Sequence, residues 1–173
     1  MQIRLAACSF LVAALCRGQQ QPNLTAQREA MQKVAFLVGT WSGDATTQLG
    51  PNETVKVRQT EEVHFKLGGL VLLIEGTGRD LKTSEVKFNA LATISWDEET
   101  KVYHFRAYND GRYLDADLKV PDKGFAWGYK AGPVDVRFMM HLDEQGQWVE
   151  VGDVKFGDNP AQRTFAMTLR KQP

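Results

Sequence analysis

From residue 39 onward, hydrophobic and polar residues alternate along most of the chain. In the segment 53–66, Val55, Val57 and Val63 fall on one face, whereas Lys56 and Arg58 fall on the other. The segments 86–96 and 134–142 alternate in the same way. An alternation of period two is typical of a β-strand that has one buried and one solvated face. The pattern therefore predicts antiparallel strands over most of the chain.

Short segments rich in Gly, Pro, Asn and Asp separate these runs, for example Asn109-Asp110-Gly111 and Gly132-Pro133. These residues favour turns because of their backbone preferences and their local hydrogen bonds. The runs between turns predict about ten strands, at 39–48, 53–66, 69–78, 86–96, 101–109, 112–120, 124–131, 134–142, 147–156 and 163–170. Before them, apolar residues at loosely helical spacing predict one short amphipathic helix over 24–38, which ends at Gly39.

Sequential antiparallel strands of this number predict an all-β fold, an antiparallel up-and-down β-barrel with a short N-terminal helix. Closure into a barrel is favoured because it leaves no exposed sheet edge. A sandwich of two sheets is the alternative. The chain has no internal repeat, which argues against a solenoid or a propeller.

The first 18 residues have the pattern of an export signal, with Arg4 ahead of an apolar run at 5–15 and then Cys16-Arg17-Gly18. Eleven apolar residues are too few to cross ~30 Å of hydrocarbon as a helix, so stable membrane insertion is not expected. We predict cleavage after Gly18, a barrel domain at 19–173, and a secreted or periplasmic location. Lipidation at Cys16 is the alternative, which Leu15 directly before it disfavours.

The composition narrows the classes of function. The 21 basic and 21 acidic residues cancel, which argues against a nucleic-acid partner or a polybasic membrane surface. The two cysteines and three histidines are too few and too scattered for a zinc cage or a disulfide framework. The chain carries no catalytic signature, so the sequence predicts a protein that is not an enzyme and has no obligatory cofactor.

Several motifs occur in a characteristic order. They are Phe36-Leu37-Val38-Gly39-Thr40-Trp41-Ser42-Gly43, Thr60-Glu61-Glu62 before a Gly-Gly turn, Trp96-Asp97 at a strand end, a strand at 103–108, and Phe165-Ala166-Met167-Thr168-Leu169-Arg170. Over residues 33–171 the chain resembles exported bacterial lipocalin-like proteins of unknown function in the calycin superfamily. It is more distantly similar to nitrobindins and fatty-acid-binding proteins. The resemblance implies that the Gly-x-Trp tryptophan closes one end of the barrel against a basic side chain of a late strand. Here that pair would be Trp41 and Arg170, in a cation–π contact.

Two polar residues, Gln59 and Glu61, interrupt the apolar face of the segment 53–66. Burying such groups without partners costs about 1–3 kcal/mol each, and Arg106, Arg137 or a Tyr hydroxyl would be suitable partners. The pair would belong to an internal polar network or a water-filled lumen, or would orient the polar end of a ligand. Acid–base catalysis by Glu61 would need a second group, which the sequence does not locate.

Aromatic residues at alternating positions of central strands predict an apolar wall around a lumen. The predicted wall residues are Trp96, Tyr103, Phe105, Phe125, Trp127 and Tyr129. All but Phe125 form the predicted ligand-binding site together with Gln59 and Glu61, and the predicted partner is a small apolar molecule. The alternative is a filled core, which would make the chain a structural or interaction module.

The similarity to nitrobindins, which bind haem through one histidine of a late strand, leaves haem as an alternative cofactor. His141 is the only histidine on a late predicted strand, although its alternation with Asp135 and Arg137 favours the outer face. His64 falls on the polar face of its strand. His104 shares its face with both apolar and charged residues.

Overall fold

The computed structural model describes residues 22–50 and 53–173. The export signal predicted at 1–18 and the cleavage site after Gly18 lie outside these residues. An α-helix, α1 (Leu24–Met31), leads into a 3₁₀ helix, η1 (Gln32–Leu37), and ten strands follow. They are β1 (Gly39–Gly50), β2 (Glu53–Lys66), β3 (Val71–Asp80), β4 (Val86–Asp97), β5 (Val102–Asn109), β6 (Arg112–Leu118), β7 (Gly124–Ala131), β8 (Val134–Leu142), β9 (Trp148–Phe156) and β10 (Gln162–Lys171).

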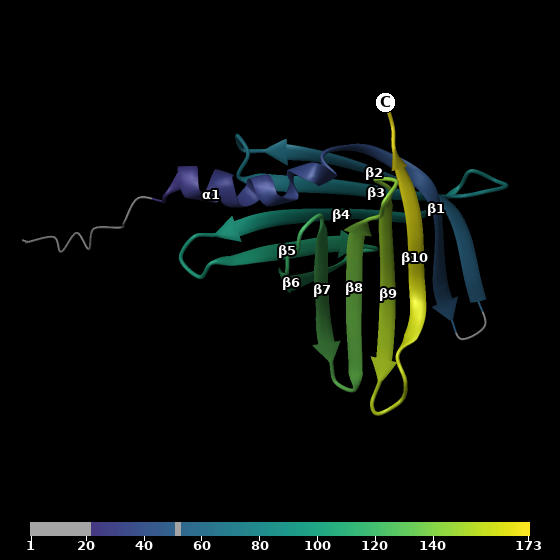
Figure 1. Cartoon of the computed structure of the whole chain (residues 1–173). Coiled ribbons are helices and arrows are strands. Elements are labelled where there is room, and N and C mark those ends of the chain that lie inside the picture. The colour runs from purple at the N-terminus through teal and green to yellow at the C-terminus, as the bar shows by residue number, and fades with distance from the viewer. Residues whose placement is uncertain (1–21, 51–52) are drawn as a thin grey trace, which may run out of the picture.

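The ten strands form one antiparallel sheet in the order β6-β5-β4-β3-β2-β1-β10-β9-β8-β7. The sheet coils into a nearly closed barrel, in which β1 pairs with β2 on one side and with β10 on the other. In Figure 1, β2–β5 run across the view and β7–β10 run down it, so the sheet turns sharply along its length. The predicted all-β barrel is confirmed, and the single sheet excludes the sandwich.

The barrel is not closed by backbone pairing all the way round. Between the edge strands β6 and β7 only an isolated bridge, Lys119 to Ala126, joins the described residues, with N···O distances of 2.9 and 2.8 Å. Side chains complete the wall at this seam, since Phe105 of β5 and Trp127 of β7 stack with ring centroids 4.8 Å apart. The expectation that closure removes every sheet edge is therefore met only in part.

The helical segment covers one end of the barrel, where it lies beside β4 and β5 (Figure 1). Met31, Val34 and Leu37 are fully buried there, and the Tyr103 hydroxyl of β5 donates to the carbonyl of Ala30 at 2.6 Å. A 3₁₀ helix brings residues i and i+3 onto one line, which places Val34 and Leu37 together on the buried side. This packing explains why the single helix predicted over 24–38 becomes 3₁₀ in its second half. Within the described residues, no helix has the length and apolar character needed to cross a membrane.

Trp41 closes this end of the barrel, but Arg170 is not its basic partner. The indole N–H of Trp41 donates to the carbonyl of Leu37 at 2.7 Å, and Lys171 Nζ lies 5.3 Å from the Trp41 ring centroid. In the β1–β10 register Trp41 is paired with Lys171, whereas Arg170 is paired with the next residue and points outward to Gln147. Strand alternation therefore assigns the cation–π contact to Lys171, one residue from the predicted Arg170.

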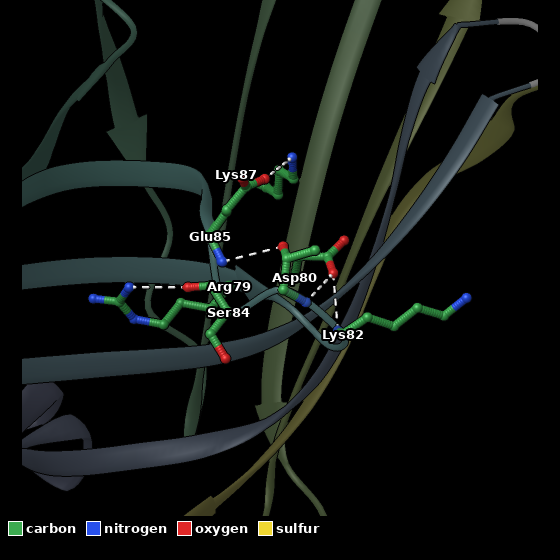
Figure 2. Close-up of polar contacts among 7 residues, drawn as sticks. Arg79, Asp80, Lys82, Ser84, Glu85 and Lys87 are labelled. Carbon is green, nitrogen blue, oxygen red and sulfur yellow. Dashed lines mark hydrogen bonds and ion pairs between the residues drawn. The ribbon is translucent and has the colours of Figure 1, made fainter.

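Hairpin turns form the opposite end of the barrel, and the β3–β4 turn among them is capped by side chains (Figure 2). Asp80 Oδ1 accepts the backbone N–H groups of Lys82 and Thr83 at 2.8 and 2.9 Å. These bonds from Thr83 and Lys82 lower the pKa of Asp80 because they stabilise the ionised carboxylate. Arg79 donates to the carbonyl of Ser84 at 3.2 Å, so both ends of the turn are tied to the strand.

Candidate functional site

A cavity of about 310 Å³ lies inside the barrel, with side chains from all ten strands in its wall. It begins at Trp148, next to the helix-covered end, and extends toward the hairpin end, where Phe88 and Asn109 lie close to turns. A volume of this size falls at the lower end of the range for small-molecule pockets, about 300–1,000 Å³. The described part of the chain therefore contains a partly open cavity in place of a fully packed interior.

Aromatic rings make up a continuous part of the cavity wall. Phe105, Trp127 and Phe138 stack in sequence, with centroid distances of 4.8 and 4.4 Å, and Phe165 follows at 5.6 Å. The Phe138 ring has room because Gly152 is its cross-strand partner, and a Cβ at Gly152 would lie only 2.5 Å from that ring. Rings fixed in this way present a rigid, apolar surface to whatever occupies the cavity.

Glu61 projects from β2 into this cavity with a neighbour on its own strand, Gln59. The two side chains are 7% and 2% exposed, and Gln59 Nε2 donates to Glu61 Oε1 at 2.7 Å. They have room because the residues opposite them on β3 are Gly76 and Gly78, where an added Cβ would lie within 2.8 Å of their oxygen atoms. Burial raises the pKa of Glu61 to about 7, although the Gln59 hydrogen bond acts in the opposite direction.

A second buried carboxyl, Glu150 of β9, lines the same cavity. It is 8% exposed, and the indole N–H of Trp148 donates to its Oε2 at 2.9 Å. Burial raises the pKa of Glu150 to about 8, the Trp148 bond lowers it, and the nearby negative charge of Glu61 raises it. The two carboxyls therefore titrate as an interacting pair near neutral pH, where they are able to accept or donate protons.

The arginines that the sequence offered as partners for Glu61 lie elsewhere. Arg106 pairs with Asp115 and Arg137 pairs with Asp135, in ion pairs on the outer surface. Strand alternation places both arginines on the outer face of the barrel, so neither reaches the lumen. Glu61 thus has a neutral amide as its hydrogen-bond donor, and no Lys or Arg among the described residues lines the cavity beside it.

Four of the predicted residues line the cavity: Glu61, Phe105, Phe125 and Trp127. Gln59 lies beside it and acts on Glu61. Three others lie outside it. They are Trp96 and Tyr103, whose rings pack 4.6 Å apart at the helix-covered end, and Tyr129, which is 40% exposed near the end of β7.

The three histidines are exposed on the outer faces of their strands, and none lines the cavity. His141 of β8 therefore does not fit the role of a haem ligand in the lumen, and His104 lies near Asp97 and Asp117 at the surface. Among residues 22–50 and 53–173, no group of three or more His, Cys, Asp or Glu side chains is arranged to hold a metal ion.

Sequence reasoning did not find Glu150 or the aromatic residues Phe88, Phe138 and Phe165. In the structure Trp148, Glu150 and Gly152 share the buried face of β9, as Gln59 and Glu61 do on β2. A charged residue between two residues of a buried face is the pattern that had singled out Glu61. In the ninth strand Val149 and Val151 make the opposite face equally apolar, so the sequence alone does not show that Glu150 points inward.

Comparisons with known proteins agree with the barrel. Residues 24–109 match the model of a family described as "Protein of unknown function (DUF1579)", and no curated protein matches the chain. Among similar solved structures, Rv2717c from M. tuberculosis has a TM-score of 0.60 and 11% identity over 83% of this chain and 98% of its own. The S-type phycobiliprotein lyase CPES from Guillardia theta has a TM-score of 0.55 and 8% identity over 84% of this chain and 92% of its own. At such identities the likeness concerns the fold alone, and it agrees with the ten-stranded antiparallel barrel.

Proposed function

We propose that this barrel binds a small, largely apolar molecule non-covalently in its lumen and does so without catalysing a reaction. The observation that supports this proposal most strongly is the cavity itself, with its stacked wall of Phe105, Trp127 and Phe138. Apolar walls with a few placed polar groups are the usual composition of a ligand site, and here Glu61 and Glu150 are the polar groups. The aromatic wall would thus contact the apolar part of a ligand, and the two carboxyls would contact its polar end.

Binding explains the cavity better than a structural role does. A filled core would place side chains in this space, because protein interiors normally pack at crystal-like density. Instead, small residues occur at inward positions of the wall, including Gly76, Ala90, Ala92 and Ala107. Side chains of this size leave room in the lumen while the larger rings around it stay in contact.

Ligand binding also explains the residue types that line the cavity better than catalysis does. No Ser, Cys, His or Lys side chain from the described part of the chain lines the cavity, so covalent catalysis by these groups has no candidate there. The wall also carries neutral donors, among them Gln48, Tyr108 and Asn109, but none of them is shown in a hydrogen bond with either carboxyl. We therefore assign Glu61 and Glu150 to recognition.

We also propose that the protein works outside the cytoplasm, in secreted or periplasmic form. The support is the export-signal pattern at residues 1–18, which contains both cysteines of the chain, Cys8 and Cys16. Residues 19–173 then contain no thiol that could be oxidised after export.

The neutral apolar fluorophore N-phenyl-1-naphthylamine tests the binding function. We expect it to bind residues 19–173 with one-to-one stoichiometry and enhanced fluorescence, because its rings fit between apolar walls. Ala90→Trp places an indole inside the lumen and should weaken binding by at least about tenfold. Fluorescence titration measures both affinities.

The matched control is Asn89→Trp, which adds the same side chain to the exposed outer face of β4, one residue away. This control should bind the fluorophore as the wild type does. An equal loss of affinity for the fluorophore in both variants, or no binding by the wild type, would contradict the proposed function.

A further inference from the structure

Two buried carboxyl groups line the same apolar cavity, which is an unusual arrangement. Glu61 comes from β2 and Glu150 from β9, strands that are separated in the sheet by β1 and β10, yet both side chains line the same space. Each has one neutral donor on its own strand, Gln59 for Glu61 and Trp148 for Glu150. Neither takes part in an ion pair, whereas the ion pairs of the described residues involve side chains at the surface.

The described residues of the lining carry no compensating positive charge. Among the described residues that line the cavity, the titratable groups are the two carboxyls and the hydroxyl of Tyr108 on β5. The other elements that face the pair contribute neutral side chains, namely Thr47 and Gln48 of β1, Ile74 of β3, Phe125 of β7, and Thr164 and Met167 of β10. An ionised carboxylate in such surroundings is strongly disfavoured unless a cation joins it.

We infer that the lumen recognises an apolar amine, whose protonated nitrogen is held by Glu61 and Glu150 while its hydrocarbon part contacts the aromatic wall. This inference rests on the proposed function, because it names the ligand class of the same cavity. A primary ammonium has three N–H donors, enough for carboxyls that approach from two different strands. The faces of the surrounding rings attract a cation as well, so the wall contributes to recognition of the charge.

Charge selects among ligands of similar shape. A carboxylate ligand would add a third negative group to the pair and is repelled, whereas an alcohol offers one donor and no charge. An ammonium converts an unfavourable pair of buried carboxyls into a neutralised cluster. The expected order of affinity is therefore amine, alcohol, then acid.

Proton release gives the amine a distinctive pH dependence. At pH 6 both carboxyls are largely protonated, because burial raises the pKa of Glu61 to about 7 and that of Glu150 to about 8. An ammonium must displace these protons, so its affinity rises as the pH is raised to about 8.5, where an alkylamine is still protonated. The affinity of an alcohol does not rise over this range, because it does not require ionised carboxyls.

A matched trio of probes tests the inference: 4-phenylbutylamine, 4-phenylbutan-1-ol and 4-phenylbutyrate, each used to displace N-phenyl-1-naphthylamine from residues 19–173. At pH 8 we expect the amine to bind at least about tenfold tighter than the alcohol, and the acid to bind weakest. Glu150→Gln and Glu61→Gln should each bring the amine close to the alcohol. Glu62→Gln, which removes a carboxyl from the outer face of β2, should leave the preference unchanged.

The outcomes separate the inference from the function on which it rests. If the fluorophore binds but the amine is no tighter than the alcohol, or the acid is tightest, the amine inference is wrong and the binding function stands. If neither the fluorophore nor any of the three probes binds, the proposed function fails and the inference fails with it.

Discussion

At pH 9 the double variant Glu61→Gln/Glu150→Gln is expected to be several kcal/mol more stable to unfolding than the wild type. Burial raises the pKa of Glu61 to about 7 and that of Glu150 to about 8, whereas an unfolded chain leaves both near 4.5. Above these values the wild type must fold with two buried charges. A glutamine keeps the size of the side chain and carries no charge at any pH.

The direction in which the stability changes with pH follows from proton binding. Between about pH 4.5 and 8 the folded state holds more protons on these carboxyls than the unfolded state does, so raising the pH lowers the stability. Below about pH 4.5 the two protonated carboxyls make their full contribution to the stability of the folded state. This contribution is lost as the pH rises through the pKa values of about 7 and 8. At ~1.4 kcal/mol per pKa unit, Glu61 alone accounts for about 3 kcal/mol.

Urea unfolding at pH 5, 7 and 9 measures this difference, with Glu62→Gln as the matched control on the exposed face of β2. The double variant and the wild type should be close in stability at pH 5 and should diverge by pH 9. The control should follow the wild type at every pH. If the double variant and the wild type change in parallel with pH, the two carboxyls are not buried as described.

Trp148→Ala is expected to destabilise the protein by about 3–5 kcal/mol, the usual loss for truncating a buried tryptophan. Trp148 is 1% exposed, and its ring makes edge contacts with Trp41 at 5.7 Å and Phe125 at 5.9 Å. The truncation opens a hole beneath the cavity and also leaves Glu150 without its indole donor. Thermal and urea unfolding at pH 5 measure the loss while both carboxyls are protonated.

Two further variants separate packing from hydrogen bonding. Trp148→Phe keeps most of the bulk but removes the N–H donor, so it should cost less than the alanine and should raise the pKa of Glu150 further. Trp127→Ala truncates a half-buried ring that borders open space, and we expect a clearly smaller loss than at Trp148. Equal losses at Trp127 and Trp148 would show that the lumen is packed solid.

The ten strands and the barrel were predictable because alternation and turn residues are local signals. Alternation also identified which side chains point inward, and this is why Glu61, Phe105 and Trp127 were found. It does not say how far along the barrel an inward side chain lies. Trp96 and Tyr103 share the inward face but belong to the packed end beneath the helix, and Tyr129 lies near the exposed end of its strand.

Features that depend on pairing between distant strands could not be predicted from the sequence. The choice of Lys171 over Arg170 beside Trp41 follows from the β1–β10 register, which no local pattern fixes. The open seam between β6 and β7 depends in the same way on how far the sheet coils before its edges meet. Glu150 belongs here too, because Val149 and Val151 alternate with it and the sequence alone does not decide which face of β9 is inward.

A crystal structure of residues 19–173 with N-phenyl-1-naphthylamine would show whether a small apolar molecule binds inside the barrel. We predict that the fluorophore lies inside the barrel, with its rings against Phe105, Trp127 and Phe138 and its amine N–H toward Glu61 or Glu150. The backbone of the barrel should stay as it is in the unliganded protein. A lumen filled by its own side chains, with the fluorophore bound only on the outer surface or at the β6–β7 seam, would contradict the account.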